Sequence, residues 1–239
     1  MTTYVLVHGA WHGGWCWHRI VAGLEYASQR AIAPDLKSLG RDRTPPAQIT
    51  LATWTDQIAA LVQAQSEPVV LVGHSRGGIV LSEVAERIPE RVRALVYVTA
   101  FMLENGQSLQ DFAAQDPESL VGPAMILNQA DGSVSIREDA VRDVFYGQCS
   151  DADVVLAKSL LVPEPLAPLA TPLRITDARF GSVPRIYVEC TKDRAMTLAA
   201  QRRMQEALPC RQRITLEADH SPFFCDSERL TDVLSKIGH

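Results

Sequence analysis

Short apolar runs alternate along the chain with segments in which apolar residues recur at helical spacing. The apolar runs, each typical of a buried strand, lie at residues 4–7, 30–35, 68–72, 92–98, 183–190 and 213–216. The segments with helical spacing lie at residues 17–24, 51–65, 78–87, 198–208 and 227–237, and Thr50 is a candidate N-cap for the second. Apolar strands that alternate with helices predict an α/β fold with a mostly parallel sheet of about six strands and helices on both faces.

One long segment departs from this alternation. Residues 101–182 hold a cluster of prolines and short amphipathic pieces at 138–145 and 151–161, and they show no strong strand. An insertion of this size after a core strand is typical of a lid over an active site, the alternative being a plain helical decoration. We therefore expect one domain, in which residues 1–100 and 183–239 form the core and residues 101–182 form a helical lid.

Composition excludes several classes of function. The chain has 239 residues, of which 46% are hydrophobic and 21% charged, as in an ordinary globular protein. A net charge of −5 argues against nucleic-acid binding, and no run of 18 apolar residues predicts a membrane span. The first residues enter a strand at once, without the pattern of a signal peptide. Five scattered cysteines are typical of small core side chains in a reducing compartment, so a cytoplasmic location is expected.

The segment Gly73-His74-Ser75-Arg76-Gly77 has the pattern of a nucleophile elbow. A predicted strand runs directly into it and a predicted helix runs directly out of it. In such a turn the serine is held in a strained conformation, and glycines two residues away on each side avoid a collision of side chains. We therefore predict that Ser75 is a catalytic nucleophile.

A serine hydroxyl needs a base, and His220 is the best placed histidine. It follows the last predicted strand, at the sheet edge where Ser75 also emerges, and it respects the chain order serine, acid, histidine. His74 adjoins Ser75 but points elsewhere, and His239 ends the chain. The three other histidines belong to the first loop and helix, at positions 8, 12 and 18.

The acid that orients the base is predicted to be Asp193, which follows the strand at 183–190. Asp219 is the neighbour of His220 in sequence and is therefore badly placed to reach its ring. Asp35 is interpreted as structural, and Glu104 is a reserve candidate.

Two backbone N–H groups are expected to form an oxyanion hole. One belongs to Arg76, directly after the nucleophile, and the other to Ala10, in the turn that leaves the first strand. His8 and His12 in the same loop could be read as a metal pair, but no carboxylate or cysteine stands near them at ligand spacing. We expect neither a metal nor an organic cofactor.

Several segments together resemble the α/β-hydrolase superfamily. More narrowly, the chain is similar to the branch that holds plant methyl-ester esterases, polyneuridine aldehyde esterase, hydroxynitrile lyases and bacterial carboxylesterases. The resemblance spans almost the whole chain and is weakest at 101–182. It implies the α/β-hydrolase fold, supports the residues named above, and adds Trp11 and the start of the lid as pocket lining. The matching segments are VLVHGAWHGGW at 5–15, LVGHS at 71–75, AFM at 100–102, IYVECTKD at 186–193 and ADH at 218–220.

Departures from that branch favour an esterase. The lyases carry Thr, Glu and Lys at the positions of Gly9, His74 and Ser221, and the lysine charge stabilises departing cyanide. Plant esterases mostly carry an apolar residue at position 76, so the side chain of Arg76 is expected to shape or charge the pocket mouth.

The leading hypothesis is a serine carboxylesterase that hydrolyses small apolar or aromatic esters. Two alternatives stay open: a hydroxynitrile or carbon–carbon lyase on the same scaffold, and a ligand receptor without catalysis. The expected partner is a small-molecule ester, with no nucleic acid and no membrane. The oligomeric state is open, with a homodimer among the alternatives.

Overall fold

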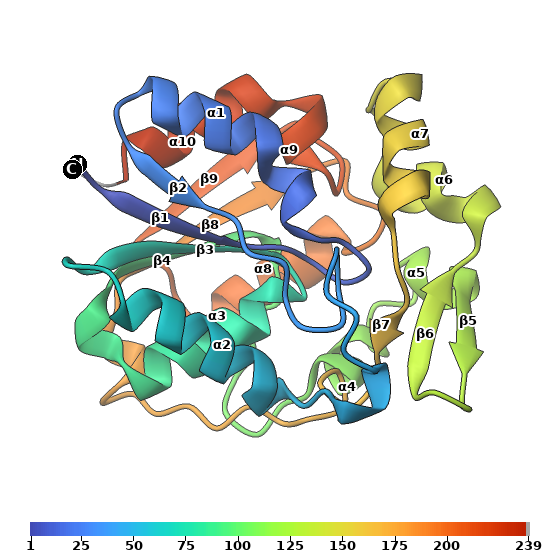
Figure 1. The fold of residues 1–239 in the computed structure, drawn as a ribbon, viewed down its shortest axis with the longest axis horizontal. Coiled ribbons are helices and arrows are strands. Elements are labelled where there is room, and N and C mark those ends of the chain that lie inside the picture. The colour runs from blue at the N-terminus through green and yellow to red at the C-terminus, as the bar shows by residue number, and fades with distance from the viewer. Residues whose placement is uncertain (238–239) are drawn as a thin grey trace.

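The computed structural model describes residues 1–237 as a parallel sheet with helices packed on both faces (Figure 1). His239, set aside above because it ends the chain, lies outside the described residues. The six strands have the order β2-β1-β3-β4-β8-β9, and every neighbouring pair is parallel. They are β1 (Thr3–Val7), β2 (Arg30–Ile32), β3 (Val69–Ser75), β4 (Val92–Ala100), β8 (Arg185–Cys190) and β9 (Gln212–Leu216).

The strands β1, β3 and β4 are mostly apolar because both faces of the sheet are buried there, whereas the edge strands β2 and β9 are partly exposed. In β1, Val5 and Val7 pack into one core cluster and Tyr4 and Leu6 into another, as the alternation of side chains along a strand requires. Helices α1 (His18–Tyr26) and α10 (Ser227–Ser235) cover the upper face in Figure 1. The opposite face carries α2 (Leu51–Gln63), α3 (Gly77–Arg87) and α8 (Leu198–Ala207).

Local signals fixed most boundaries of these elements. Thr50 is the N-cap of α2 as predicted, and its hydroxyl accepts a hydrogen bond from the Thr53 N–H at 3.1 Å. β2 is shorter than predicted: it ends at Ile32, where the first loop packs closely against the chain that follows it. A Cβ at Gly14 would stand 2.2 Å from the Ala33 carbonyl oxygen, so the two segments are in direct contact.

The segment at 101–182 was expected to be helical, and this expectation is wrong in part. It holds a three-stranded antiparallel sheet made of β5 (Met125–Asn128), β6 (Ser133–Ile136) and β7 (Glu164–Pro165). The strands are short, and β7 has two residues, so none produces a clear alternation in the sequence. The helices of the segment are α4 (Leu109–Ala113), α5 (Val121–Ala124), α6 (Val141–Phe145) and α7 (Asp151–Leu160).

This insertion lies beside the carboxyl ends of the sheet strands (Figure 1). The Val162 N–H donates to the Trp11 carbonyl at 3.0 Å, and Arg19 of α1 forms an ion pair with Asp153 of α7 at 2.6 Å. Its role as a lid stays a prediction. Short turns of 3₁₀-helix complete the chain at Gly14–Trp17, Pro46–Gln48, Pro89–Arg91, Glu138–Ala140 and Phe180–Ser182, and a short helix, α9, at Pro222–Cys225.

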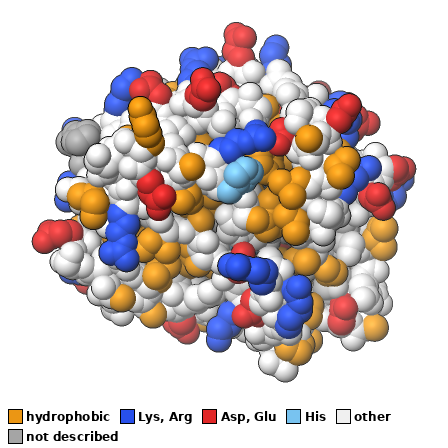
Figure 2. Space-filling view, turned by 45° about the horizontal axis from the view of Figure 1, so that its top comes forward, with side chains coloured by type: hydrophobic (Ala, Val, Ile, Leu, Met, Phe, Trp, Pro, Cys, Tyr) orange, Lys and Arg blue, Asp and Glu red, His pale blue; other side chains and the backbone are white. Residues whose placement is uncertain are grey.

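The outer surface is mixed in character. In Figure 2, hydrophobic side chains gather around a histidine on the face shown, with charged side chains spread around them. Helix α7 exposes Val155, Leu156 and Leu160. Among residues 1–237, no helix has the length and apolar character needed to cross a membrane.

Candidate active site

Ser75 ends β3 in a strained backbone conformation. Its φ is +51°, in the left-handed region that a residue other than glycine rarely occupies. Glycines make the turn possible, because a Cβ at Gly77 would stand 2.7 Å from the Val7 carbonyl oxygen and one at Gly78 would stand 2.2 Å from that of Phe101. The tight strand-to-helix turn predicted from the sequence is therefore present.

Asp193 and His220 meet across the turns that follow β8 and β9. The imidazole Nδ1 donates to Asp193 Oδ2 at 2.7 Å, and both side chains are buried. The other carboxylate oxygen accepts the N–H groups of Ala195 at 2.7 Å and Met196 at 2.8 Å. Because Nδ1 carries the proton in this arrangement, Nε2 is left as the proton acceptor.

Thr99 completes the surroundings of the acid, and sequence reasoning missed it. Its hydroxyl donates to Asp193 Oδ2, and its φ is +37°, a strained value for a β-branched residue. Thr99 lies near the end of β4, beside the elbow strand β3. A threonine inside an apolar strand gave no signal for this contact, which spans 94 residues of sequence.

His74 brings His220 to the elbow. The His74 Nε2–H donates to the His220 carbonyl at 2.7 Å, and the two ring centroids lie 4.5 Å apart. Burial among other histidines holds the pKa of His74 well below its ordinary value, so its ring is neutral. No hydrogen bond joins Ser75 directly to His220 among the described residues. The two are connected through His74, which precedes Ser75 in the chain and donates to the His220 carbonyl.

The two predicted oxyanion donors lie next to Ser75. A Cβ at Gly9 would stand 3.0 Å from the Ser75 Cβ, so the loop after β1 touches the elbow. Within residues 1–237, the N–H groups of Ala10 and Arg76 donate to no protein acceptor. Both donors are thus available to a bound group.

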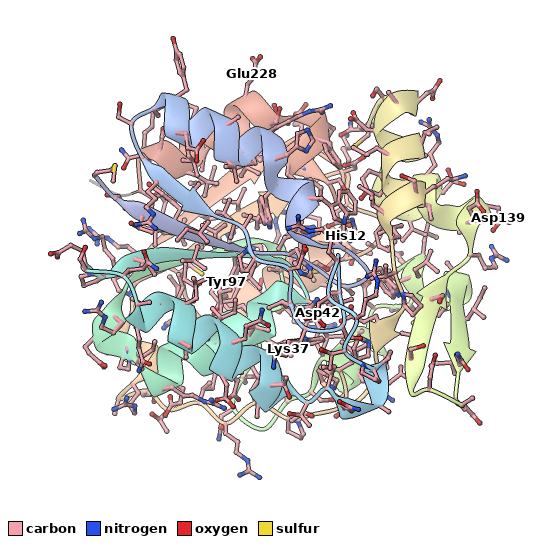
Figure 3. All side chains as sticks on the ribbon, in the orientation of Figure 1. His12, Lys37, Asp42, Tyr97, Asp139 and Glu228 are labelled. Atoms are coloured by element: carbon pink, nitrogen blue, oxygen red, sulfur yellow. The ribbon has the colours of Figure 1, made fainter. Side chains whose placement is uncertain are left out.

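His8 and His12 hold this loop in place, a function that the sequence did not reveal. Nδ1 of His8 lies 2.9 Å from the Gly9 carbonyl and Nδ1 of His12 lies 2.6 Å from the Ala10 carbonyl. Their Nε2 atoms accept from the Leu36 N–H and the Tyr146 hydroxyl, which fixes both tautomers. Burial lowers the pKa of His8 to about 3 and that of His12 to about 4, so both rings are neutral. Figure 3 shows His12 on the side of the sheet that faces the insertion.

The side chain of Arg76 does not reach the pocket mouth, contrary to expectation. It is 1% exposed and its Nε donates to Glu164 Oε1 of β7 at 2.8 Å. Burial raises the pKa of Glu164, although the neighbouring guanidinium opposes that rise. Glu164 was not identified from the sequence, because it lies 88 positions away in a strand of two residues.

The other candidate acids have partners of their own. Asp35 accepts the Gly14 N–H at 2.7 Å and forms an ion pair with Arg41. Asp219 accepts the N–H groups of Gln148 at 2.6 Å and Ser221 at 2.8 Å.

A metal could find ligands in one cluster of the described residues. One ligand atom each from Cys149, Asp219 and Cys225 lies within 4.8 Å of the others. The Cys225 sulfur is 3.3 Å from Asp219 Oδ1, and the Cys149 sulfur is 3.9 Å from Oδ2. These contacts suit thiol protons shared with a carboxylate, and the sulfhydryl of Cys149 has a raised pKa beside Cys225 in a buried position.

Aromatic side chains of the loop and the insertion cover the site. The ring of Phe145 in α6 lies 5.6 Å from His220 and 5.5 Å from Trp11, centroid to centroid. Three surface cavities of about 450, 220 and 590 Å³ surround this region, and Trp11 borders the second. None of the three is lined by Ser75 or His220, which are 8% and 2% exposed. Asp193 lines the first cavity, whereas Ser75 and His220 are buried, with Phe145 of the insertion against the His220 ring.

Comparison with known proteins places these features in a family. Residues 4–233 match the model of the "Alpha/beta hydrolase family". Salicylic acid-binding protein 2 of Nicotiana tabacum is 31% identical over 99% of this chain and 96% of its own length. Methylesterase 1 of Arabidopsis thaliana is 32% identical over 98% of this chain and 95% of its own length.

A solved structure agrees with this match. The crystal structure of polyneuridine aldehyde esterase superposes with a TM-score of 0.88 at 25% identity, with 100% of both chains covered.

The chain also spans 63%, 55% and 56% of the length of three chloroplastic putative methylesterases of Arabidopsis thaliana.

Proposed function

The chain belongs to the α/β-hydrolase family, and on that premise we propose that it is a serine carboxylesterase. The observation that carries the proposal is the Asp193–His220 hydrogen bond of 2.7 Å, held beside the strained Ser75 by His74. The similar proteins support ester hydrolysis, because they include a methylesterase and polyneuridine aldehyde esterase.

In the proposed mechanism, Ser75 Oγ attacks the ester carbonyl and its proton passes to His220 Nε2. The N–H groups of Ala10 and Arg76 would stabilise the oxyanion, and Asp193 would stabilise the imidazolium. The alcohol leaves with the proton from His220, which leaves an acyl group on Ser75. Water, deprotonated by His220, then releases the acid and restores the enzyme.

We propose small apolar or aromatic esters as substrates. The ring of Phe145 lies 5.6 Å from that of the candidate base His220, and the ring of Trp11 lies 5.5 Å from Phe145, so the two offer aromatic contact area to a substrate. Methyl esters are the first substrates to test, because relatives carry the name methylesterase.

The test is turnover of p-nitrophenyl esters graded by acyl length, with a mandelonitrile cleavage assay in parallel. We expect ester turnover, no cyanide release, and a fall in kcat of roughly 10⁴-fold or more in Ser75→Ala. Cyanide release without ester turnover would support the lyase. Binding of an aromatic acid without any turnover would support the receptor.

A cytoplasmic location is kept as a proposal. It is supported by five free cysteines, three of them buried. Fractionation of the source cells, followed by detection of the protein, would test it.

A further inference from the structure

The guanidinium of Arg76 is buried at the candidate oxyanion hole although the role of that residue there needs only its backbone. Its Nε donates to Glu164 at 2.8 Å and its Nη2 donates to the Gly9 carbonyl at 2.9 Å. Its Cζ lies 4.2 Å from the ring centroid of Trp54. Two of its three nitrogens have hydrogen-bond partners, whereas Nη1 is buried without one. Removing one member of such a buried pair would leave the other charge uncompensated.

These contacts close a ring around Ala10. Glu164 Oε1 accepts from Arg76, and its Oε2 accepts the Trp11 N–H at 2.9 Å. Arg76 in turn binds the Gly9 carbonyl, on the other side of Ala10. The peptide groups before and after Ala10 are therefore both tied to one ion pair.

The ring contributes to the direction of the Ala10 N–H together with His8, whose Nδ1 also lies 2.9 Å from the Gly9 carbonyl. The Gly9 carbonyl and the Ala10 N–H belong to one planar trans peptide, in which the two groups point in opposite directions. Because the carbonyl faces the Arg76 guanidinium, the N–H faces away from it. A hydrogen bond from a cation to the carbonyl also polarises the peptide, which strengthens the N–H as a donor.

The backbone of Trp11 supports the same conclusion. Its φ is +62°, which is strained for a bulky side chain and persists only where the surroundings enforce it. Glu164 binds its N–H, and the Val134 carbonyl accepts its indole N–H at 2.8 Å. Both anchors come from the insertion, so the insertion fixes the loop that carries the oxyanion donor.

We propose that the Arg76–Glu164 pair is a positioning device that sets the Ala10 N–H for the oxyanion and couples the insertion to the reaction. The proposal rests on the proposed esterase function. It assigns to Arg76 a second contribution through its side chain, and to Glu164 a contribution to kcat without contact with the substrate.

The test uses the full chain with the double variant Arg76→Met/Glu164→Met. It removes the pair without leaving one charge buried alone, so the fold is expected to persist. Glu164→Gln is a second variant, which keeps an acceptor for the Trp11 N–H. Arg19→Met is the matched control, because Arg19 also ties the insertion to the core through Asp153, while its side-chain hydrogen bonds in the described structure go to Asp153 and the Phe224 carbonyl and not to residues 8–15.

We expect kcat to fall about 10- to 100-fold in the double variant, below the 10²- to 10³-fold effect of deleting an oxyanion donor, with a nearly unchanged KM. Affinity for a trifluoromethyl ketone, which forms an oxyanion on the serine, should fall by the same factor. Affinity for the acid product should not change. Arg19→Met should keep wild-type kcat.

Amide hydrogen exchange in the peptide over residues 8–15 supplies a readout independent of turnover. We expect faster exchange in the double variant, and wild-type exchange in Arg19→Met. Unchanged kcat and ketone affinity in both pair variants, unchanged exchange, or an equal loss in Arg19→Met would overturn the proposal. A failure of the proposed esterase function gives a different result, because the wild-type protein would then turn over no ester. The hydrogen-exchange measurement would still test whether the Arg76–Glu164 pair holds the loop.

Discussion

At the scale of single residues, the candidate site is defined by what each polar atom contacts. Four hydrogen bonds converge on the carboxylate of Asp193, from His220, Thr99 and two backbone N–H groups. Asp219, one position before His220, instead accepts backbone N–H groups of its own surroundings. Two neighbouring carboxylates therefore have different contacts, and their substitution should have different effects.

Asp193→Asn should lower kcat by roughly 10³- to 10⁴-fold, because an amide can hold the imidazole in the wrong tautomer. Asp219→Asn should mainly lower the free energy of unfolding, by about 1–3 kcal/mol, because two hydrogen bonds lose a charged acceptor. Steady-state kinetics and urea unfolding of both variants measure this. The acid assignment is wrong if Asp219→Asn abolishes turnover and Asp193→Asn does not.

The buried histidines of the first loop predict a pH dependence of stability. His8 and His12 have folded-state pKa values of about 3 and about 4, below the ordinary 6.5. Between the folded-state pKa and 6.5, the unfolded chain binds more protons than the folded chain. The two histidines therefore contribute their whole stabilisation above pH 6.5, and the free energy of unfolding decreases as the pH falls toward 4. Each histidine contributes a slope of at most about 1.4 kcal/mol per pH unit.

Urea unfolding between pH 4.5 and 7.5 measures this slope. Because carboxylates also titrate at the acid end, His12→Gln is the comparison that isolates one imidazole. Its slope should be smaller than that of the wild-type protein. Equal slopes in the two proteins would contradict the neutral, buried state of His12.

At the scale of elements, close backbone contacts hold the elbow between β3, β4 and α3. Gly78→Ala would bring a Cβ to 2.2 Å from the Phe101 carbonyl oxygen, while Gly147→Ala would meet nothing within 4 Å. We expect the first to lower the free energy of unfolding by roughly 1–3 kcal/mol or more and the second to leave it nearly unchanged. Chemical denaturation of both variants tests this, and equal stabilities would contradict the packing described for α3.

The insertion is expected to set substrate preference through Phe145, whose ring lies near those of both His220 and Trp11. Phe145→Ala should change the relative kcat/KM of small and large esters by roughly 1–3 kcal/mol. Asp139→Ala is the control, because Asp139 lies on the outer side of the insertion (Figure 3). An unchanged ranking in Phe145→Ala would move specificity away from this part of the insertion.

At the scale of the whole molecule, local patterns predicted the core well and the insertion poorly. The buried strands, the elbow and the Thr50 cap each depend on a few consecutive residues, so hydrophobic periodicity and glycine spacing identify them. Tyr97 illustrates the limit. From the sequence it is one more strand residue, and only the fold places its hydroxyl 2.9 Å from the Ser82 hydroxyl of α3; Figure 3 labels Tyr97.

The parts that sequence reasoning missed depend on contacts between distant segments. Thr99 meets Asp193 across 94 positions, and Arg76 meets Glu164 across 88. A single polar residue in a short or apolar element does not change the hydrophobic periodicity, and a strand of two residues such as β7 is too short to have a periodicity. The prediction that the Arg76 side chain shapes the pocket mouth was therefore wrong, although the position of its backbone at the elbow was predicted.

The most direct test of the account is the location of a covalent adduct. The protein is treated with a serine-directed organophosphate, and the modified residue is mapped by mass spectrometry in the wild type and in Ser75→Ala. The account predicts one adduct on Ser75, complete loss of ester turnover in step with labelling, and no adduct in the variant. An adduct on another residue, or full labelling of Ser75→Ala, would contradict the claim that Ser75 is the nucleophile.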